Sequence, residues 1–318
     1  MPDAPDLISV IVTNYNHAAF LDQRMQSLLE QTYPNLEIIV IDNCSTDNSR
    51  EVLAKYRTKA NIKIVEMQEN IGNINTSNMG VTMSRGEFFI FAEADDYSAP
   101  QEIELLHQAM AGHEETGAAF CRSYMVDGQG KIFDEDFNYR DRAFKEFCSK
   151  DTLIQGAQAQ RFFLFSCIIP NFSAVLFRRK YYDLVQGMSH RFKTCADWDF
   201  WFRMTEHCDL YYLTTPLNYF RRHAKTTGNL YGIELTLKEI MTLLYTQARQ
   251  TPLNFWEQLR FKVNLGVIWG RYRKPAPAIW WKCFPAVWRE TLKYDKLSVL
   301  YLTIAFIKRS AQRRFNKA

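Results

Sequence analysis

Four apolar segments near the start of the sequence are separated by helix-forming stretches, and this alternation restricts the fold more than any other feature. The segments span residues 7–13, 36–41, 62–67 and 87–92 and are rich in β-branched or aromatic side chains. Strands that alternate with helices build a mainly parallel sheet with helices on its faces. The sequence therefore predicts an α/β fold, and 318 residues with 47% hydrophobic content can bury its core.

A polar loop follows each of the four apolar segments. The loops are TNYN at 13–16, DNCSTD at 42–47, NIGN at 70–73 and EADD at 93–96. Ligands of such sheets bind outside the carboxyl ends of the strands. We therefore expect the four loops to converge on one site at an edge of the sheet.

The last of these loops places three carboxylates, Glu93, Asp95 and Asp96, close together in the sequence. Like charges at this spacing raise one another's energy unless a cation or a ligand offsets them. Hard divalent cations bind carboxylate and phosphate oxygens together, so a metal ion with a diphosphate would remove the repulsion. Taken alone, the same letters also fit a solvated loop or a helix cap.

The signals change character after residue 100. Mixed helical and strand patterns continue to about residue 230, and from residue 232 on the pattern is helical, with breaks at prolines. The mixed part has helical segments at 103–110 and 195–204 and strand segments at 117–126 and 173–179, and the end of a further strand leads into a loop within 219–229. We therefore expect a catalytic domain over residues 1–230 and a helical C-terminal region over residues 231–318.

Charge divides the chain in a similar way. The net charge of +4 combines a balance of +12 over residues 241–318 with a balance of −8 over residues 1–240. The tail also holds five of the seven tryptophans. Basic residues interleaved with tryptophan suit an anionic lipid surface, so we expect the C-terminal region to contact one. A helical extension packed on the catalytic domain is the alternative.

One apolar run in the tail bears on this choice. It covers residues 297–307, which is shorter than the roughly 20 residues that span a bilayer. An interfacial helix is the preferred interpretation. Four basic residues flank it: Lys308, Arg309, Arg313 and Arg314.

The location of the protein is predicted from its cysteines and its first residues. The seven cysteines are scattered and form no CxxC pair, which favours reduced thiols over a disulfide framework or a zinc site. The sequence does not start with a basic leader and a long apolar stretch, so we expect no secretory signal. These features predict a cytoplasmic protein, peripheral at the inner face of the membrane. Nucleic acid is not an expected partner, because no recognition module accompanies the basic residues.

The four loops, followed by ADWDFWFR at 196–203 and RRH at 221–223, resemble in their order the inverting family 2 glycosyltransferases. The resemblance covers roughly residues 7–225 in six ordered motifs. It implies a GT-A domain, a Rossmann-like nucleotide-sugar-binding fold. The implied reaction moves a sugar from a nucleotide-sugar donor, a UDP-sugar, to a hydroxyl of a saccharide or lipid-linked saccharide with inversion, in cell-surface polysaccharide synthesis.

The resemblance also assigns a donor site. Thr13 and Tyr15 match positions beside the nucleoside base, and Asp42 matches the carboxylate that accepts a hydrogen bond from the uracil ring. Gly72 and Asn78 match a segment that lines the donor pocket, although Ser77 stands where many relatives have a basic residue. The implied donor-binding residues are Thr13, Asn14, Tyr15, Asp42, Gly72, Asn78, Glu93, Ala94, Asp95 and Arg222.

The same resemblance implies a metal site and a general base. Asp95 corresponds to a ligand of Mn2+ or Mg2+, with Asp96 beside it, and His223 matches a histidine that completes the site. Asp197 aligns with the acidic residue that takes the proton from the acceptor hydroxyl, and Ala196 stands before it where the family usually has Glu. Asp199 is the weaker candidate for this base. The other histidines, at 17, 107, 113, 190 and 207, are interpreted as structural.

Two other functions remain open on the sequence. A sugar-phosphate nucleotidyltransferase would have a Gly-rich, basic phosphate loop after the first strand, and the residues at 13–20 do not provide one. A non-catalytic nucleotide-sugar-binding protein or membrane scaffold would keep the donor loops and lose the base. Replacement of Asp197 distinguishes that second alternative from an enzyme.

Overall fold

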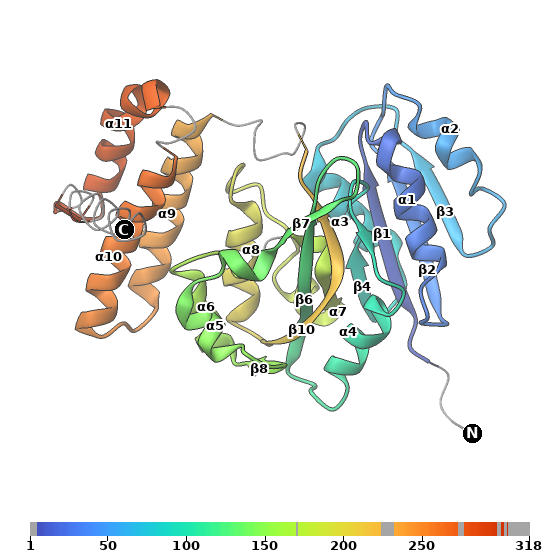
Figure 1. The fold of residues 1–318 in the computed structure, drawn as a ribbon, viewed down its shortest axis with the longest axis horizontal. Coiled ribbons are helices and arrows are strands. Elements are labelled where there is room, and N and C mark those ends of the chain that lie inside the picture. The colour runs from blue at the N-terminus through green and yellow to red at the C-terminus, as the bar shows by residue number, and fades with distance from the viewer. Residues whose placement is uncertain are drawn as a thin grey trace. The chain divides into compact units, whose positions relative to one another are not determined.

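A computed structural model describes residues 5–169, 171–223, 232–272, 277–297, 300–301 and 304 (Figure 1). The chain divides into two compact units. Unit 1 comprises Met1–Ala159, Ile168–Ser189 and Arg203–His223, and unit 2 comprises Gln160–Cys167, His190–Phe202 and Ala224–Ala318. Two short stretches that precede residue 224 thus belong to unit 2.

The first four long strands of unit 1 pair in parallel, as their alternation with helices predicts. Strand β1 (Ile8–Asn14) lies between β2 (Leu36–Asp42) and β4 (Phe88–Phe91), and β3 (Ile62–Glu66) pairs with β2. All seven residues of β1 are buried. Strands covered on both faces read as continuous apolar runs, which explains why the sequence shows no alternation here.

The rest of the sheet is mixed. Strand β9 (Val175–Arg178) is antiparallel to both β4 and β6 (Thr116–Val126), and β10 (Asp209–Arg221) runs parallel to β6. The order across the sheet is β3-β2-β1-β4-β9-β6-β10-β5. The short strands are β5 (Tyr97–Ser98), β7 (Ile132–Glu135), which pairs with β6, and β8 (Thr152–Ile154), which pairs with β10.

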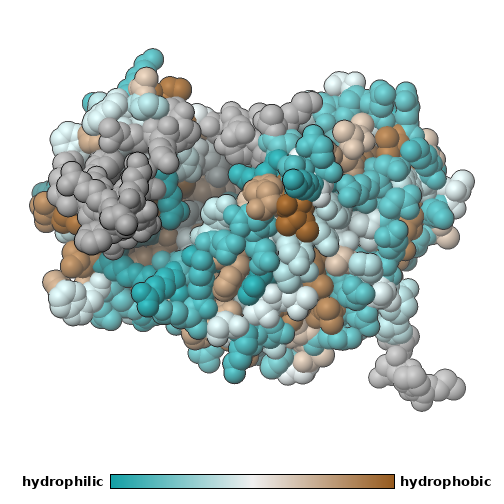
Figure 2. Space-filling view, in the orientation of Figure 1, coloured by the Kyte–Doolittle hydropathy of each residue, from teal (hydrophilic) through white to brown (hydrophobic). Residues whose placement is uncertain are grey.

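Helices follow the strands of the parallel part and cover the sheet (Figure 1). They are α1 (Ala18–Leu29), α2 (Ser49–Ala54), α3 (Asn73–Met83) and α4 (Glu102–Met110). Leu21, Met25 and Leu28 of α1 are buried in the same cluster as Val10 and Val12 of β1. Burial of this face against β1 fixes the direction of α1 relative to the end of that strand, which we call the rim of the sheet together with the ends of β2 and β4. The surface seen in Figure 2 is mainly hydrophilic, with scattered apolar side chains.

Four further helices follow along the chain. They are α5 (Arg142–Phe147), α6 (Gly156–Phe163), α7 (Arg179–Leu184) and α8 (Ala196–Thr205), and two single-turn 3₁₀ helices cover Asp136–Tyr139 and Phe172–Ala174. Helix α8 is where the sequence predicts one, and it carries Asp197 in its first turn.

Unit 2 contains three long helices, α9 (Ile233–Gln250), α10 (Phe255–Arg271) and α11 (Pro277–Leu292). Asn254 and Glu257 form a capping box at the start of α10, which satisfies backbone N–H groups that the helix leaves unpaired. Trp280 is buried and donates its indole N–H to the carbonyl of Trp269 at 2.9 Å. The aromatic residues of the tail therefore supply part of the core of this unit.

Among the described residues, no helix combines the length and the apolar character that crossing a membrane requires. Leu297, Leu300, Tyr301 and Ile304 are the described residues of the 297–307 run. The basic residues predicted to flank that run, Lys308, Arg309, Arg313 and Arg314, lie outside the described residues.

Candidate active site

The ends of β1 and β2 bring two polar side chains together, as the parallel pairing requires. Asn14 and Asp42 are partners in the register of the two strands. The Asn14 amide donates to Asp42 Oδ1 at 2.7 Å and to Ser45 Oγ at 3.1 Å. The loops that follow these strands are therefore tied to each other at the rim of the sheet.

Asp42 is fully buried, and both of its oxygens have partners inside unit 1. Oδ1 also accepts from Ser45 Oγ at 2.5 Å, and Oδ2 accepts from the Ser45 backbone N–H at 3.1 Å. Arg50 Nε lies 3.7 Å from Oδ2. Asp42 thus orders the 42–47 loop, and its contact with a nucleoside base stays a prediction.

Tyr15 lies at the same rim with 44% of its surface exposed. The next residue, Asn16, has a φ of 60°, a left-handed conformation that asparagine adopts more readily than most residues. Its side-chain oxygen accepts from the Thr46 backbone N–H at 2.7 Å. This turn leaves the Tyr15 ring open to solvent, as stacking on a base requires.

The third loop leads into α3. Gly72 precedes α3 with a φ of 82°, which glycine adopts without strain. The Asn78 amide donates to the Met188 carbonyl at 2.9 Å, and its oxygen accepts from Tyr182 Oη at 2.6 Å. Asn78 therefore holds the segment that contains Met188, and its part in donor binding stays a prediction.

The acidic loop after β4 contains two carboxylates with raised pKa values. Burial, together with the charges of Asp95 and Asp96, raises the pKa of Glu93 to about 8. Thr13 Oγ1 donates to Glu93 Oε2 at 3.3 Å, which links the first and fourth loops. Ala94 is buried between the acidic residues. An added cation at this loop would lower the pKa of Glu93 again.

Asp96 points away from the rim. It is 2% exposed, and its oxygens accept from Ser173 Oγ at 2.6 Å and from the Arg221 backbone N–H at 2.8 Å. Burial raises its pKa above the ordinary value. These contacts favour an anchoring role for Asp96 over the metal ligation that the sequence predicts.

A buried cation offsets part of this negative charge. Arg24 of α1 is 1% exposed and donates through Nε to the Glu93 carbonyl at 3.0 Å and through Nη1 to Ser98 Oγ at 3.3 Å. Burial lowers the pKa of Arg24, and the charges of Asp96 and Glu102 act in the opposite direction. Sequence reasoning missed Arg24, because one arginine in an amphipathic helix gives no sign that it lies on the buried face.

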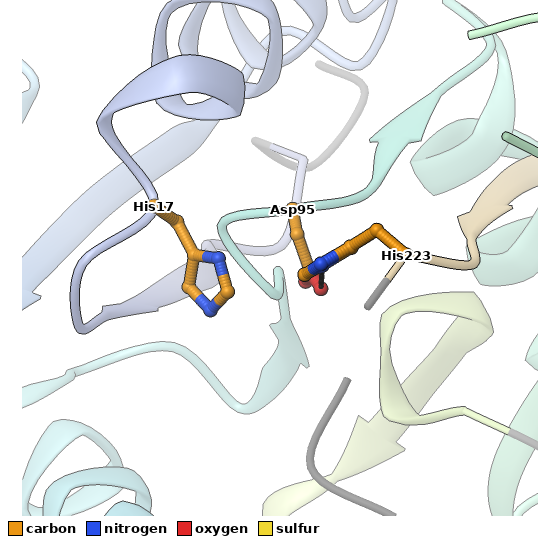
Figure 3. A group of neighbouring side chains, drawn as sticks. All are labelled: His17, Asp95 and His223. Atoms are coloured by element: carbon orange, nitrogen blue, oxygen red, sulfur yellow. Dashed lines mark hydrogen bonds and ion pairs between the residues drawn. The ribbon is translucent and has the colours of Figure 1, made fainter. Parts of the chain in front are cut away.

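Three side chains at the rim form a group of potential metal ligands (Figure 3). His17 follows β1, Asp95 follows β4 and His223 follows β10. His223 Nε2 lies 2.9 Å from Asp95 Oδ2, and one ligand atom from each of the three residues lies within 4.8 Å of the others. The sequence predicts Asp95 and His223 as ligands, whereas it predicts a structural role for His17.

The spacing of these atoms fits a bound ion. Ligands at about 2.1 Å from a metal lie about 3 Å apart when they are at right angles, which agrees with the pair His223 and Asp95. Two imidazoles with one carboxylate suit a transition metal such as Mn2+ better than Mg2+.

Arg221 and Arg222 differ in their surroundings. The Arg221 guanidinium is buried and donates to the Asp95 carbonyl at 2.7 Å and to Gln23 Oε1 at 2.7 Å. Arg221 therefore anchors the backbone of the acidic loop at Asp95. Arg222 is exposed and lies over the ring of Phe220, 5.3 Å from its centroid. Its contact with a donor stays a prediction.

Asp197, the predicted base, belongs to unit 2. It is half-buried in the first turn of α8, and its Oδ1 accepts from the Trp198 backbone N–H at 2.8 Å. Burial raises its pKa above the ordinary value. Asp199 is 1% exposed and lies 3.6 Å from Arg191. Of the two carboxylates, Asp197 is thus the more accessible to an acceptor.

Comparison with known proteins identifies the family of this chain. Residues 9–182 match the family described as Glycosyl transferase family 2, which is more than half of the chain. The chain belongs to glycosyl transferase family 2. The matched range includes the loops of the rim from Thr13 to Asp96, and it ends before Asp197 and His223.

Several curated relatives are similar to this family 2 member over part of its length. An uncharacterised glycosyltransferase of Nostoc sp. is 33% identical over 40% of the chain and 40% of the relative. The poly(ribitol-phosphate) beta-N-acetylglucosaminyltransferase TarS of Staphylococcus aureus is 36% identical over 28% of the chain and 16% of TarS. The putative teichuronic acid biosynthesis glycosyltransferase TuaG of Bacillus subtilis is 31% identical over 31% of the chain and 39% of TuaG. The chain thus spans well under two thirds of these relatives.

Solved structures resemble the fold of the family 2 chain over nearly its whole length. Residues 1–349 of S. aureus TarS in complex with UDP-GlcNAc give a TM-score of 0.67 at 18% identity, covering 96% of this chain and 92% of that one. The mannosyltransferase PcManGT of Pyrobaculum calidifontis, in complex with GDP-Man and Mn2+, gives 0.57 at 16% identity, covering 96% and 88%. The predicted GT-A α/β fold with C-terminal helices is thereby confirmed.

Proposed function

We propose that this glycosyltransferase moves a sugar from a UDP-sugar to a hydroxyl of a saccharide or lipid-linked saccharide, with inversion, in cell-surface polysaccharide synthesis. The observation that carries the proposal is the approach of His223 to Asp95 at the rim where β1, β2 and β4 end, 2.9 Å between Nε2 and Oδ2. Parallel sheets of this kind bind their ligands at that edge. The resemblance to TarS with UDP-GlcNAc supports a uridine nucleotide, and the names of TarS and TuaG support a surface polymer.

The donor is proposed to lie along the rim of unit 1. The exposed Tyr15 would stack on the base, with Thr13 and Asn14 beneath it and Asp42 within the same loop network. Gly72 would allow close approach of the backbone to the donor. The remaining proposed donor contacts are Asn78, Glu93, Ala94, Asp95 and Arg222.

A divalent cation, Mn2+ or Mg2+, is proposed to be held by Asp95 and His223, with His17 as a third ligand. The bound ion would offset the negative charge of the diphosphate. The similar mannosyltransferase PcManGT has Mn2+ with its GDP-Man, which supports a metal in this position. Arg221 would keep Asp95 in place through the hydrogen bonds that its guanidinium donates within unit 1.

Asp197 is proposed to take the proton from the acceptor hydroxyl. Its raised pKa makes the carboxylate a stronger base than an exposed aspartate. The hydroxyl oxygen would then attack the anomeric carbon from the face opposite the nucleotide, which inverts the configuration. The division into a catalytic domain to residue 230 and a C-terminal region that meets the inner membrane surface belongs to the same proposal.

A paired measurement tests the assignment of Asp197. Asp197→Asn keeps the shape of the side chain and removes its basicity, so we expect UDP-sugar binding to persist while transfer and donor hydrolysis fall at least about a hundredfold. The matched control is Glu206→Gln, an exposed carboxylate just beyond α8, which is expected to leave both unchanged. Unchanged turnover in Asp197→Asn would favour a non-catalytic nucleotide-sugar-binding protein.

A further inference from the structure

Helix α11 has two apolar faces, and only one of them is buried. Trp280, Cys283, Val287 and Thr291 are buried on the inner face, and α11 packs against α9. A surface helix of a globular protein has a single apolar stripe that faces the core. A second apolar stripe on the same helix therefore calls for another function.

The second stripe consists of Trp281, Pro285, Trp288 and Leu292, which we call the outer stripe. All four residues are exposed, Trp281 at 55% and Trp288 at 38%. At about 100° per residue, these positions fall within an arc of about 60° on the helix. They thus form one continuous exposed line about three turns long.

A basic strip lies directly beside the outer stripe. Lys282, Arg289 and Lys293 each follow a residue of the stripe by one position, so they share the adjoining sector of the helix. All three are exposed. Lys293 pairs with Glu290 at 2.7 Å, which leaves Lys282 and Arg289 as the main charges of the strip. Tryptophan beside lysine and arginine is typical of helices that lie in a lipid headgroup layer.

We propose that the outer stripe and its basic strip dock this chain on an anionic lipid surface. The inference rests on the proposed function, because it names the residues by which the enzyme would reach a lipid-linked acceptor. The indole rings would lie at headgroup depth while the basic side chains meet lipid phosphates. The helix would lie along the surface, with the outer stripe turned toward the lipid.

Charge and area favour lipid over a second copy of the chain. A pair of copies joined by their outer stripes would bring two basic strips into close proximity, and like charges at an interface are unfavourable. Stable protein interfaces also bury about 800 Å² on each partner. Four side chains on a single helix offer much less than that area.

Vesicle flotation of the full-length protein tests the inference. Vesicles of phosphatidylglycerol and phosphatidylcholine are compared with pure phosphatidylcholine, with donor and acceptor omitted. We expect Trp281→Ser/Trp288→Ser to lower recovery with the anionic vesicles at least about fivefold, and Lys282→Gln/Arg289→Gln to remove most of the preference for anionic lipid. Far-UV circular dichroism and the thermal midpoint check that both variants fold.

Trp256→Ser provides the matched control. Trp256 is 73% exposed at the start of α10, next to the acidic Glu257, and we expect its replacement to leave recovery unchanged. Equal recovery of the stripe variant and the wild type overturns the inference, as does an equal loss in the control. A wild-type dimer in light scattering that the stripe variant converts to monomer also overturns it. Donor turnover measured separately distinguishes this failure from a failure of the proposed function.

Discussion

Replacement of Arg221 by methionine probes how the acidic loop is held at the rim. The buried guanidinium donates to the carbonyls of Asp95, Asp127 and Gly128 at 2.7, 2.9 and 3.2 Å and to Gln23 Oε1 at 2.7 Å. Methionine keeps an unbranched apolar stem, but it is shorter than arginine and donates no hydrogen bond. Arg221→Met therefore removes the hydrogen bonds and retains the packing of the stem.

The magnitude follows from these contacts. Each buried acceptor left without a partner costs about 1–3 kcal/mol, and water or small shifts can satisfy some of the four. The donor is a charged group, and a hydrogen bond to a charged group contributes about 1.5–3 kcal/mol. We therefore expect Arg221→Met to lower the free energy of unfolding by roughly 3–5 kcal/mol.

Urea unfolding followed by tryptophan fluorescence and circular dichroism measures this loss. Arg222→Met is the matched control, since the neighbouring arginine is exposed, and its effect should stay below about 0.5 kcal/mol. We also expect weaker Mn2+ binding in Arg221→Met, because the Asp95 carbonyl loses its support. A loss of stability below about 1 kcal/mol would refute the claim that Arg221 anchors the loop.

Three further predictions follow from single residues. His17→Gln should weaken Mn2+ binding roughly tenfold in isothermal titration calorimetry, and the exposed His207→Gln should leave it unchanged; equal affinities for His17→Gln and wild type would remove His17 from the site. Burial raises the pKa of Glu102 from its ordinary value of 4.5 to about 8 in the folded protein. The contribution of Glu102 to the free energy of unfolding is therefore fully present below the pKa of the unfolded chain, and it is lost as the pH rises from there through 8. Glu102→Gln should therefore gain roughly 3 kcal/mol over wild type between pH 5 and 8 in urea unfolding, and parallel stability curves would contradict this. The pKa of Asp197 is raised above the ordinary aspartate value of 3.8, and the base form is lost as pH falls, so the acidic limb of the kcat/KM profile should lie above pH 3.8. An acidic limb at or below pH 3.8 would contradict the assignment of Asp197.

The sequence predicts the half of the sheet that has a regular pattern. Continuous apolar runs define β1 to β4, and parallel pairing brings their loops to one rim, so that Asn14 and Asp42 are neighbours as expected. The antiparallel entry of β9 between β4 and β6 is a long-range pairing. Its residues carry no local signal for the direction in which the strand runs.

The details of the site depend on side-chain directions that the sequence does not show. Asp95 and Asp96 are adjacent, yet Asp95 faces His223 while Asp96 accepts from Ser173 and Arg221. Residues 93–96 form a turn that is closed by a hydrogen bond from the Asp96 backbone N–H to the Glu93 carbonyl at 3.1 Å, and the apolar pattern of β4 does not show which side chain of this turn reaches the rim. His223 and Asp95 are 128 residues apart in the sequence, so no local pattern links them. Only the resemblance to the family predicts that they lie together.

Two members of the site come from helix α1 and the loop before it, and neither has a sequence signal of its own. The burial of Arg24 depends on which face of α1 meets the sheet, and the hydrophobic pattern alone does not reveal that a cation lies there. His17 follows the TNYN loop, and that position is a signal that could have suggested it as a rim residue.

Calorimetric titration of UDP tests the central claim most directly, that a metal ion at Asp95 and the rim loops bind a nucleoside diphosphate. The titration is carried out on the wild type with Mn2+, on the wild type with EDTA, and on Asp95→Asn with Mn2+. We predict measurable binding in the first case and affinities at least about a hundredfold lower in the other two. Equal UDP affinity in all three, or no binding by the wild type with Mn2+, would contradict the account.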